Sequence, residues 1–223
     1  MSITLATGAI VAIAKTYAAS VSVTAATNSV AAGFTATTTL TTGSAHSVSP
    51  GEYVEVTSGW GRLDRKVARC TTGTTGSTLV LENVDTFDTV KFPSGQGIGS
   101  VRKITAWSNL SQIKSMSTSG GDQQYADVTS LDDVVEKKVP TIRSAVSMEL
   151  EVYDDPTLTW YADVTVAADA ATPYAVRISS PNGAKTVANA YWSLMKVPMM
   201  AKNEAMTTKV SLSYAADPVR YTA

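Results

Sequence analysis

The chain has 223 residues, a net charge of -1 and one cysteine. That length is enough for one large or two small domains with a substantial hydrophobic core. Acidic and basic residues are nearly balanced, which argues against a groove that grips phosphates tightly. A single Cys70 excludes an internal disulfide framework, and we expect its thiol to be buried among apolar side chains.

Residues 1–28 are expected to form an N-terminal arm that contains strands. Lys15 is the only charged residue before Glu52, and the intervening sequence is rich in Ala, Thr, Ser and Val. Such β-branched side chains favour strands over helices. The apolar run GAIVAIA has no basic region before it and is far shorter than the ~20 residues of a membrane-spanning helix. We therefore expect neither secretion nor membrane insertion.

Residues 29–99 are expected to form a small additional β-domain. Short alternating runs such as EYVEVTS and STLVLENV are separated by turns rich in Gly, Ser and Thr. This spacing is typical of a small antiparallel barrel or sandwich. The run GQGIG at 95–99 is interpreted as an exit linker. A dinucleotide-binding turn would need a helix after it, whereas the residues that follow are strand-like.

Residues 100–223 are expected to form a β-sandwich with one helix. The segment IRSAVSMELEV alternates apolar and polar residues, which is the pattern of a half-buried strand. Asp154-Asp155-Pro156 predicts a helix start and a helix near 156–168. Pro181-Asn182-Gly183 predicts a β-hairpin. The expected fold class is mainly β, with one short α-helix and the small domain before it.

Residues 119–141 form a long acidic stretch that we expect to be an exposed loop. Five acids face only Lys137 and Lys138, so the stretch cannot belong to a core. Loops of this length are usually functional or disordered. A cation site at Asp132-Asp133 is disfavoured, because adjacent side chains in extended backbone point to opposite faces and the spacing of a calcium loop is missing. Contact with another protein surface explains the stretch better.

The sequence offers no constellation of residues suited to catalysis. His46 lies in the uncharged stretch GSAHSVS, which is typical of a turn. No Ser-His-Asp, Cys-His or metal-ligand spacing can be assembled around it. We therefore expect no catalytic residue, no metal site and no cofactor.

Three motifs resemble the tail tube proteins of long-tailed, siphovirus-type bacteriophages. They are GGDQQYADVTSLDD at 120–133, VSMELEVYDDPTLTWYA at 146–162 and VRISSPNGAK at 176–185. The resemblance covers residues 100–220 well and the first hundred loosely. It implies a structural virion protein whose six-membered rings stack into a tube, and the genome passes through this tube into the host.

The resemblance also implies roles for particular residues. The long loop would contact neighbouring subunits and rings, and Glu149 and Glu151 on the polar face of one strand are candidates for facing the lumen. An acidic lumen would repel DNA phosphates. The loop residues expected to make these contacts are Gly120, Asp122, Tyr125, Asp127, Thr129, Leu131, Asp132 and Asp133.

The partners implied are further copies of the chain, the tape measure protein, the tail terminator and the distal tail protein. Double-stranded DNA would pass through without specific binding, and no membrane would be involved. The protein would be made in the host cytoplasm and end in the virion.

Two other functions remain open from the sequence. One is a different phage structural role, such as a tail terminator, connector or decoration protein. The other is a carbohydrate-binding β-sandwich module, in which Tyr53, Trp60 and Trp107 would form a platform for sugars.

Overall fold

The computed structural model describes residues 8–30, 32–33, 35–132 and 134–222. The first seven residues of the expected N-terminal arm, and Asp133 of the expected contact loop, lie outside the described residues. The fold is mainly β, as predicted, and α1 (Thr159–Ala170) is the only helix in the described ranges. The strands are β1 (Ile10–Tyr17), β2 (Val21–Thr27), β3 (Thr37–Thr42), β4 (Tyr53–Ser58), β5 (Val67–Arg69), β6 (Thr78–Glu82), β7 (Gly99–Leu110), β8 (Ile113–Ser119), β9 (Gln123–Asp127), β10 (Lys138–Arg143), β11 (Ser147–Tyr153), β12 (Tyr174–Ser179), β13 (Lys185–Leu194), β14 (Thr207–Tyr214) and β15 (Val219–Tyr221).

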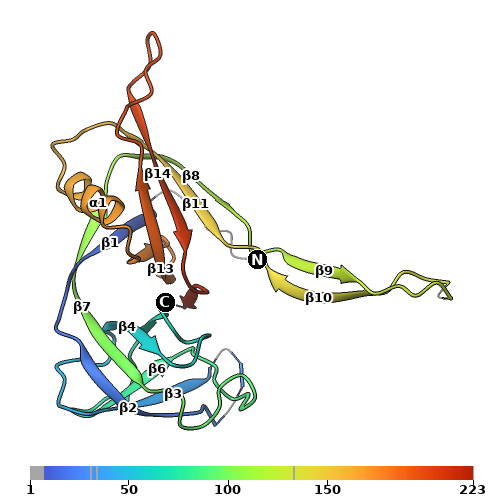
Figure 1. The fold of residues 1–223 in the computed structure, drawn as a ribbon. Helices are drawn as coiled ribbons and strands as arrows, with labels where there is room; N and C mark the ends of the chain where they lie inside the picture. The colour runs from blue at the N-terminus through green and yellow to red at the C-terminus, as the bar shows by residue number, and fades with distance from the viewer. Residues whose placement is uncertain (1–7, 31, 34, 133, 223) are drawn as a thin grey trace.

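Strand pairing joins two lobes into one continuous sheet. Thirteen of the described strands belong to it, in the order β6-β3-β2-β7-β1-β12-β13-β14-β11-β8 with β4, β5 and β15 attached to this path. Strand β7 crosses between the lobes: its start pairs with β2 and β4, and its end pairs with β1. Strands β9 and β10 form a separate pair that projects sideways from the larger lobe (Figure 1).

The small lobe draws on residues outside the expected limits at 29 and 99. Strand β2 pairs with β3 and β7, and Val23 and Val101 lie in the core of this lobe. The glycine-rich run is not a linker. A Cβ atom on Gly97 would lie 2.9 Å from the Trp60 ring and 2.5 Å from Ala26, so this backbone packs inside the lobe.

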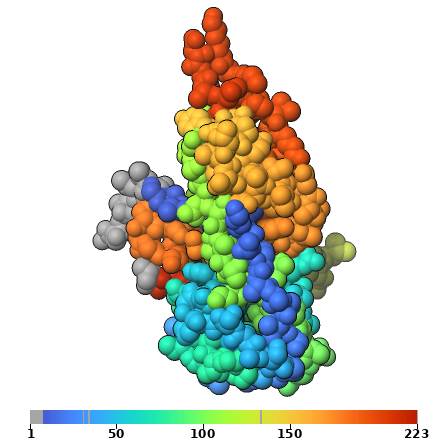
Figure 2. Space-filling model, turned by 90° about the vertical axis from the view of Figure 1, so that its left-hand side faces the viewer, coloured from blue at the N-terminus to red at the C-terminus, as the bar shows by residue number. Residues whose placement is uncertain are grey.

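The large lobe has a core between its sheet and α1. Met148, Leu150 and Val152 alternate on the buried face of β11, as the sequence pattern predicts. Helix α1 covers this face with Trp160 and Val164. Figure 2 shows α1 on the outside of the large lobe and the small lobe at one end, with the β13–β14 connection projecting from the other end. Within the described ranges, no helix has the length and apolar character needed to cross a membrane.

The start of the helix differs from the prediction, whereas the hairpin is confirmed. Asp155 accepts hydrogen bonds from the amide and the hydroxyl of Thr157, at 3.0 and 2.6 Å, which builds a turn before the helix. The residue preceding α1 is Leu158, and it makes no side-chain cap. The short Asp side chain therefore satisfies local turn amides instead of the helix N-terminus. Gly183, with φ of +84°, lies in the turn that joins β12 and β13.

Candidate assembly surfaces

The stretch at 119–141 is a hairpin arm and not the structureless loop that the sequence predicted. Strands β9 and β10 pair with Tyr125 opposite Pro140 and Asp127 opposite Lys138. Nearly every residue of both strands is exposed. The prediction missed the strands because charged and polar residues occupy both faces, so no apolar alternation marks them. An isolated two-stranded hairpin is only marginally stable in water, and no other strand of the described ranges pairs with this arm.

Large apolar side chains are exposed along the arm and at its tip. Leu131 and Val134 are fully exposed, and Tyr125 is 61% exposed. Contiguous apolar exposure of this kind is typical of a surface that another protein covers. The exposed apolar residues of the arm are Tyr125, Val128, Leu131, Val134, Val135, Val139 and Ile142.

A pair of glycines joins the arm to the sheet. Gly120 and Gly121 both have φ of +85°, a conformation that other residues rarely adopt. A Cβ atom on Gly120 would lie 2.0 Å from the carbonyl oxygen of Ala145. On the arm side, the Ser144 hydroxyl accepts a hydrogen bond from the Asp122 amide at 3.0 Å. The joint therefore sets the direction of the arm, and only glycine fits at position 120 without a rearrangement.

The acids near the arm tip are held by neighbouring hydroxyl groups. Thr129 donates from its amide and its hydroxyl to Asp127, and these bonds hold the pKa of Asp127 below its ordinary value. The Ser130 hydroxyl likewise lowers the pKa of Asp132. The carboxylates stay ionised, and Leu131 lies between them. The seven expected contact residues within the described ranges all lie on the arm or at its joint.

The polar face of β8, β11 and β14 carries the two expected lumen residues. Glu149 forms an ion pair with Lys209, and Glu151 forms one with Lys114 at 2.9 Å. These bonds raise the pKa values of both lysines and lower that of Glu151. The face is thus of mixed charge. Lys114 was not expected at this face, although the strand-like run LSQIKSMS at 110–117 contains it.

Serine side chains fill most of the remaining positions on this face. Glu149 lies between Ser117 and Ser211 in the register of the three strands. Hydroxyl groups are small and neutral, so they add little attraction for a passing polyanion. The serines on this face are Ser115, Ser117, Ser119, Ser147, Ser211 and Ser213, and Ser193 on the adjacent strand β13 lies opposite Ser211.

A buried polar cluster ties the small lobe to the large one. The Glu55 carboxylate, whose side chain is 7% exposed, accepts hydrogen bonds from Arg102 at 3.0 Å and from Asn189 at 3.0 Å. The Arg102 guanidinium also lies 4.0 Å from the centroid of the Tyr17 ring. Strands β4, β7 and β13 supply the polar residues, so the cluster spans both lobes.

Strand β15 makes a second link between the lobes. It pairs with β13, and Tyr221 is fully buried. The Tyr221 hydroxyl accepts a hydrogen bond from the Arg69 amide at 2.7 Å and donates one to the Glu82 carbonyl at 3.3 Å. The small lobe is therefore held firmly against the sheet of the large lobe.

The three aromatic residues of the alternative sugar-binding interpretation do not form a surface platform. Trp60 and Tyr53 are buried, and Trp60 packs edge-on against Phe92. Trp107 packs against Tyr53 and beneath the Arg177 guanidinium. These aromatic rings serve the cores of the lobes, so the carbohydrate-binding interpretation loses the residues on which it rested.

The surroundings of Cys70 and His46 indicate structural roles for both side chains. Cys70 is buried, as predicted, and burial raises the pKa of its thiol to about 12. The His46 side chain accepts a hydrogen bond from the Val48 amide inside a turn. Among the described residues, no group of three or more His, Cys, Asp or Glu side chains is arranged to hold a metal ion.

Comparison with known families decides between the remaining interpretations. A family model described as phage tail tube protein, TTP, matches residues 58–223. The chain belongs to the phage tail tube protein family. A tail tube protein is a structural component of the virion and not an enzyme, and the exposed arm and polar sheet face described above belong to such a component.

Other comparisons add little to this assignment. A structure of the anti-feeding prophage baseplate is 10% identical over 53% of this chain and 86% of that chain, with a TM-score of 0.37. The tube-terminating cap of the same particle is 19% identical over 48% of this chain and 79% of that chain, with a TM-score of 0.35. Neither likeness is close enough to carry an argument. No curated protein matches the chain.

Proposed function

We propose that this tail tube protein polymerises as stacked, six-membered rings into the tail tube of a siphovirus-type phage. The tube would conduct the genome into the host. The observation that carries the proposal is the β9–β10 arm, whose apolar side chains are exposed and are not covered by the described part of its own subunit. A further copy of the chain supplies that surface in an assembled tube.

Two open strand edges support ring formation. Among the described strands, β8 is the last strand of the sheet and pairs only with β11. The end of β13, Tyr191–Leu194, pairs with β14 on one side, while its pairing with β12 stops at Ala190. Open edges invite pairing with another chain, and a closed ring removes them. We propose that β8 of one subunit extends the sheet of the next subunit near this end of β13.

The polar face of β8, β11 and β14 would then line the lumen. Its acids, Glu149 and Glu151, are balanced by Lys209 and Lys114, so the wall would be close to neutral. A neutral wall rich in serine gives little counterion release on contact with DNA, which lets double-stranded DNA move without specific binding.

The ends and interior of the tube would contact the tail terminator, the distal tail protein and the tape measure protein. Synthesis would take place in the host cytoplasm, before assembly into the virion. None of these contacts involves a membrane.

Removal of the arm tests the proposal. Ser119 lies opposite Ser147 in the β8–β11 register, so residues 120–146 can be replaced by an Asn-Gly turn that closes a direct hairpin. We expect a folded subunit with nearly unchanged thermal stability, because the arm residues are exposed. Electron microscopy of the concentrated variant should show no tubes, under conditions in which the unmodified chain forms them.

A milder pair of variants separates arm contacts from general surface effects. Val135→Ser changes an exposed apolar residue of the arm, and Val166→Ser changes a comparably exposed one on α1. We expect only Val135→Ser to weaken assembly. Normal tubes from the chain without its arm would refute the proposed role of the arm.

A further inference from the structure

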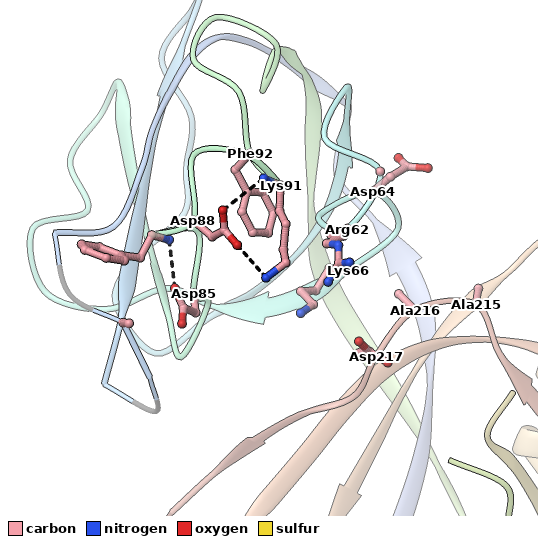
Figure 3. Close-up of a pocket in the computed structure, with 13 residues that line it drawn as sticks. Arg62, Asp64, Lys66, Asp85, Asp88, Lys91, Phe92, Ala215, Ala216 and Asp217 are labelled. Carbon is pink, nitrogen blue, oxygen red and sulfur yellow. Dashed lines mark hydrogen bonds and ion pairs between the residues drawn. The ribbon is translucent and has the colours of Figure 1, made fainter. Parts of the chain in front are cut away.

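A cleft of about 550 Å³ separates the small lobe from the connection between β14 and β15. Figure 3 shows Arg62 and Lys66, from the connection between β4 and β5, beside Asp217 on the opposite wall. Phe87, which is 53% exposed, contributes apolar surface. The cleft therefore combines charged groups with an aromatic side chain, in a volume that is typical of binding pockets.

Most of the acids in the cleft already have partners. Asp85 accepts hydrogen bonds from two backbone amides, each at 2.9 Å. Asp88 forms an ion pair with Lys91 at 2.6 Å, and Asp64 accepts a hydrogen bond from a backbone amide at 3.1 Å. These three carboxylates are already paired within the small lobe, so they contribute little to the binding of a partner.

Two cationic side chains of the cleft, those of Arg62 and Lys66, are available to bind a partner. Within the described part of the chain, the side chains of Arg62 and Lys66 make no hydrogen bond or ion pair. Burial lowers the pKa of Lys66, and the nearby Asp217 opposes this effect. A desolvated ammonium gains strongly from an additional carboxylate. Arg62 and Lys66 therefore favour a ligand that carries carboxylates, and Phe87 favours one that also carries apolar side chains.

The arm tip of this chain has that combination. Leu131, Val134 and Val135 are exposed, and Asp132 lies beside them. Glu136 is also near the tip, where it forms an ion pair with Lys138 at 3.2 Å; both side chains are largely exposed, so this pair is weak. The hydrogen bond to Asp132 from Ser130 engages one carboxylate oxygen, and a carboxylate can accept several such bonds. Figure 1 shows that the β9–β10 arm extends away from the small lobe of its own subunit, whose residues line most of the cleft. The arm of the same subunit therefore does not reach the cleft, whereas the arm of another copy can.

We propose that the cleft receives the arm tip, residues 128–137, of a neighbouring copy, with Arg62 and Lys66 facing its carboxylates and Phe87 facing its apolar side chains. This inference rests on the proposed tube assembly and assigns a role to the small lobe. The lobe is fixed to its own sheet through Glu55 and Tyr221, so a tip bound in the cleft would hold two subunits in a defined relation.

Cysteine cross-linking tests the contact directly. One chain carries Leu131→Cys at the tip, and a second carries Ala216→Cys in the cleft wall. The two variants are mixed together with unmodified protein so that tubes still form, and a short bismaleimide is then added. Cys70 is buried with a raised thiol pKa, so it contributes little background. We expect a cross-linked dimer of the two variants, and much less product when Val166→Cys replaces Ala216→Cys.

Charge exchange provides a second test. Arg62→Glu should reduce the cross-linking yield at least about tenfold, and adding Asp132→Arg on the tip chain should restore much of it. Lys202→Glu, at an exposed lysine in the β13–β14 connection, is the matched control. Tubes that form without cross-links between tip and cleft would overturn this inference and leave the tube proposal standing. An unmodified chain that never forms tubes would overturn both.

Discussion

Replacement of Arg102 by methionine should destabilise the protein more than neutralisation of its partner, Glu55. Arg102→Met leaves the Glu55 carboxylate, which is 7% exposed, with Asn189 as its remaining donor. Removing one partner of a buried ion pair costs about 3–5 kcal/mol. The Arg102 side chain is 40% exposed, so water can enter after the change, and we expect about 2–4 kcal/mol.

The partner variant, Glu55→Gln, should cost less. It keeps an acceptor for Asn189, and the partly exposed Arg102 guanidinium can be hydrated, so we expect about 1–2 kcal/mol. For a domain of this size, 1 kcal/mol shifts Tm by about 2–4 °C. Arg102→Met should therefore lower Tm by about 5–15 °C. The double variant should cost less than the sum of the two single changes, because neither residue is then left charged and unpaired.

Urea denaturation and thermal unfolding measure these differences. Lys196→Met is the control, since its ion pair with Asp169 is exposed on both sides and is worth about 0–1 kcal/mol. A loss below about 1 kcal/mol for Arg102→Met, or a larger loss for Glu55→Gln, would refute the conclusion that this buried cluster holds the lobes together.

Two further predictions concern the arm joint and the small lobe. Gly120→Ala places a Cβ atom 2.0 Å from the Ala145 oxygen, so the joint must rearrange; a folded subunit that no longer forms tubes is expected, whereas Gly76→Ala, with open space around it, should assemble. Normal tubes from Gly120→Ala would show that the direction of the arm does not matter. Asp85→Asn should destabilise the protein by about 0.5–1 kcal/mol at neutral pH. Backbone hydrogen bonds lower the pKa of Asp85 in the folded state, so its stabilisation is full above the ordinary carboxyl pKa and is lost as the pH falls through the folded value. Unfolding curves of the two proteins should therefore converge in acid, and a difference that persists there would contradict this origin.

Local patterns in the sequence were sufficient for many elements of the fold. Period-two alternation predicted the buried face of β11, with Leu150 inside and Glu149 outside. The run Asn182-Gly183 predicted the β12–β13 hairpin, because few residues other than Asn and Gly tolerate positive φ. These features depend on residues that are close together in the chain, and their physical causes are therefore visible in sequence.

Other features depend on contacts between distant residues. The arm strands lack apolar alternation, so only their backbone pairing reveals them. The close packing of Gly97 depends on Trp60, which is distant in the sequence. The pairing of Glu151 with Lys114 likewise joins residues on different strands.

By itself, the sequence determined a mainly β chain with a charged, exposed stretch, and its motifs were enough to indicate the tail tube family. The tertiary structure decided that this stretch is an arm, that the two lobes share one sheet, and that Glu55 meets Asn189 across their boundary. The physical reason is that alternation specifies which face a side chain occupies but not which strand lies beside it. Strand partners are chosen by packing and hydrogen bonding over the whole chain.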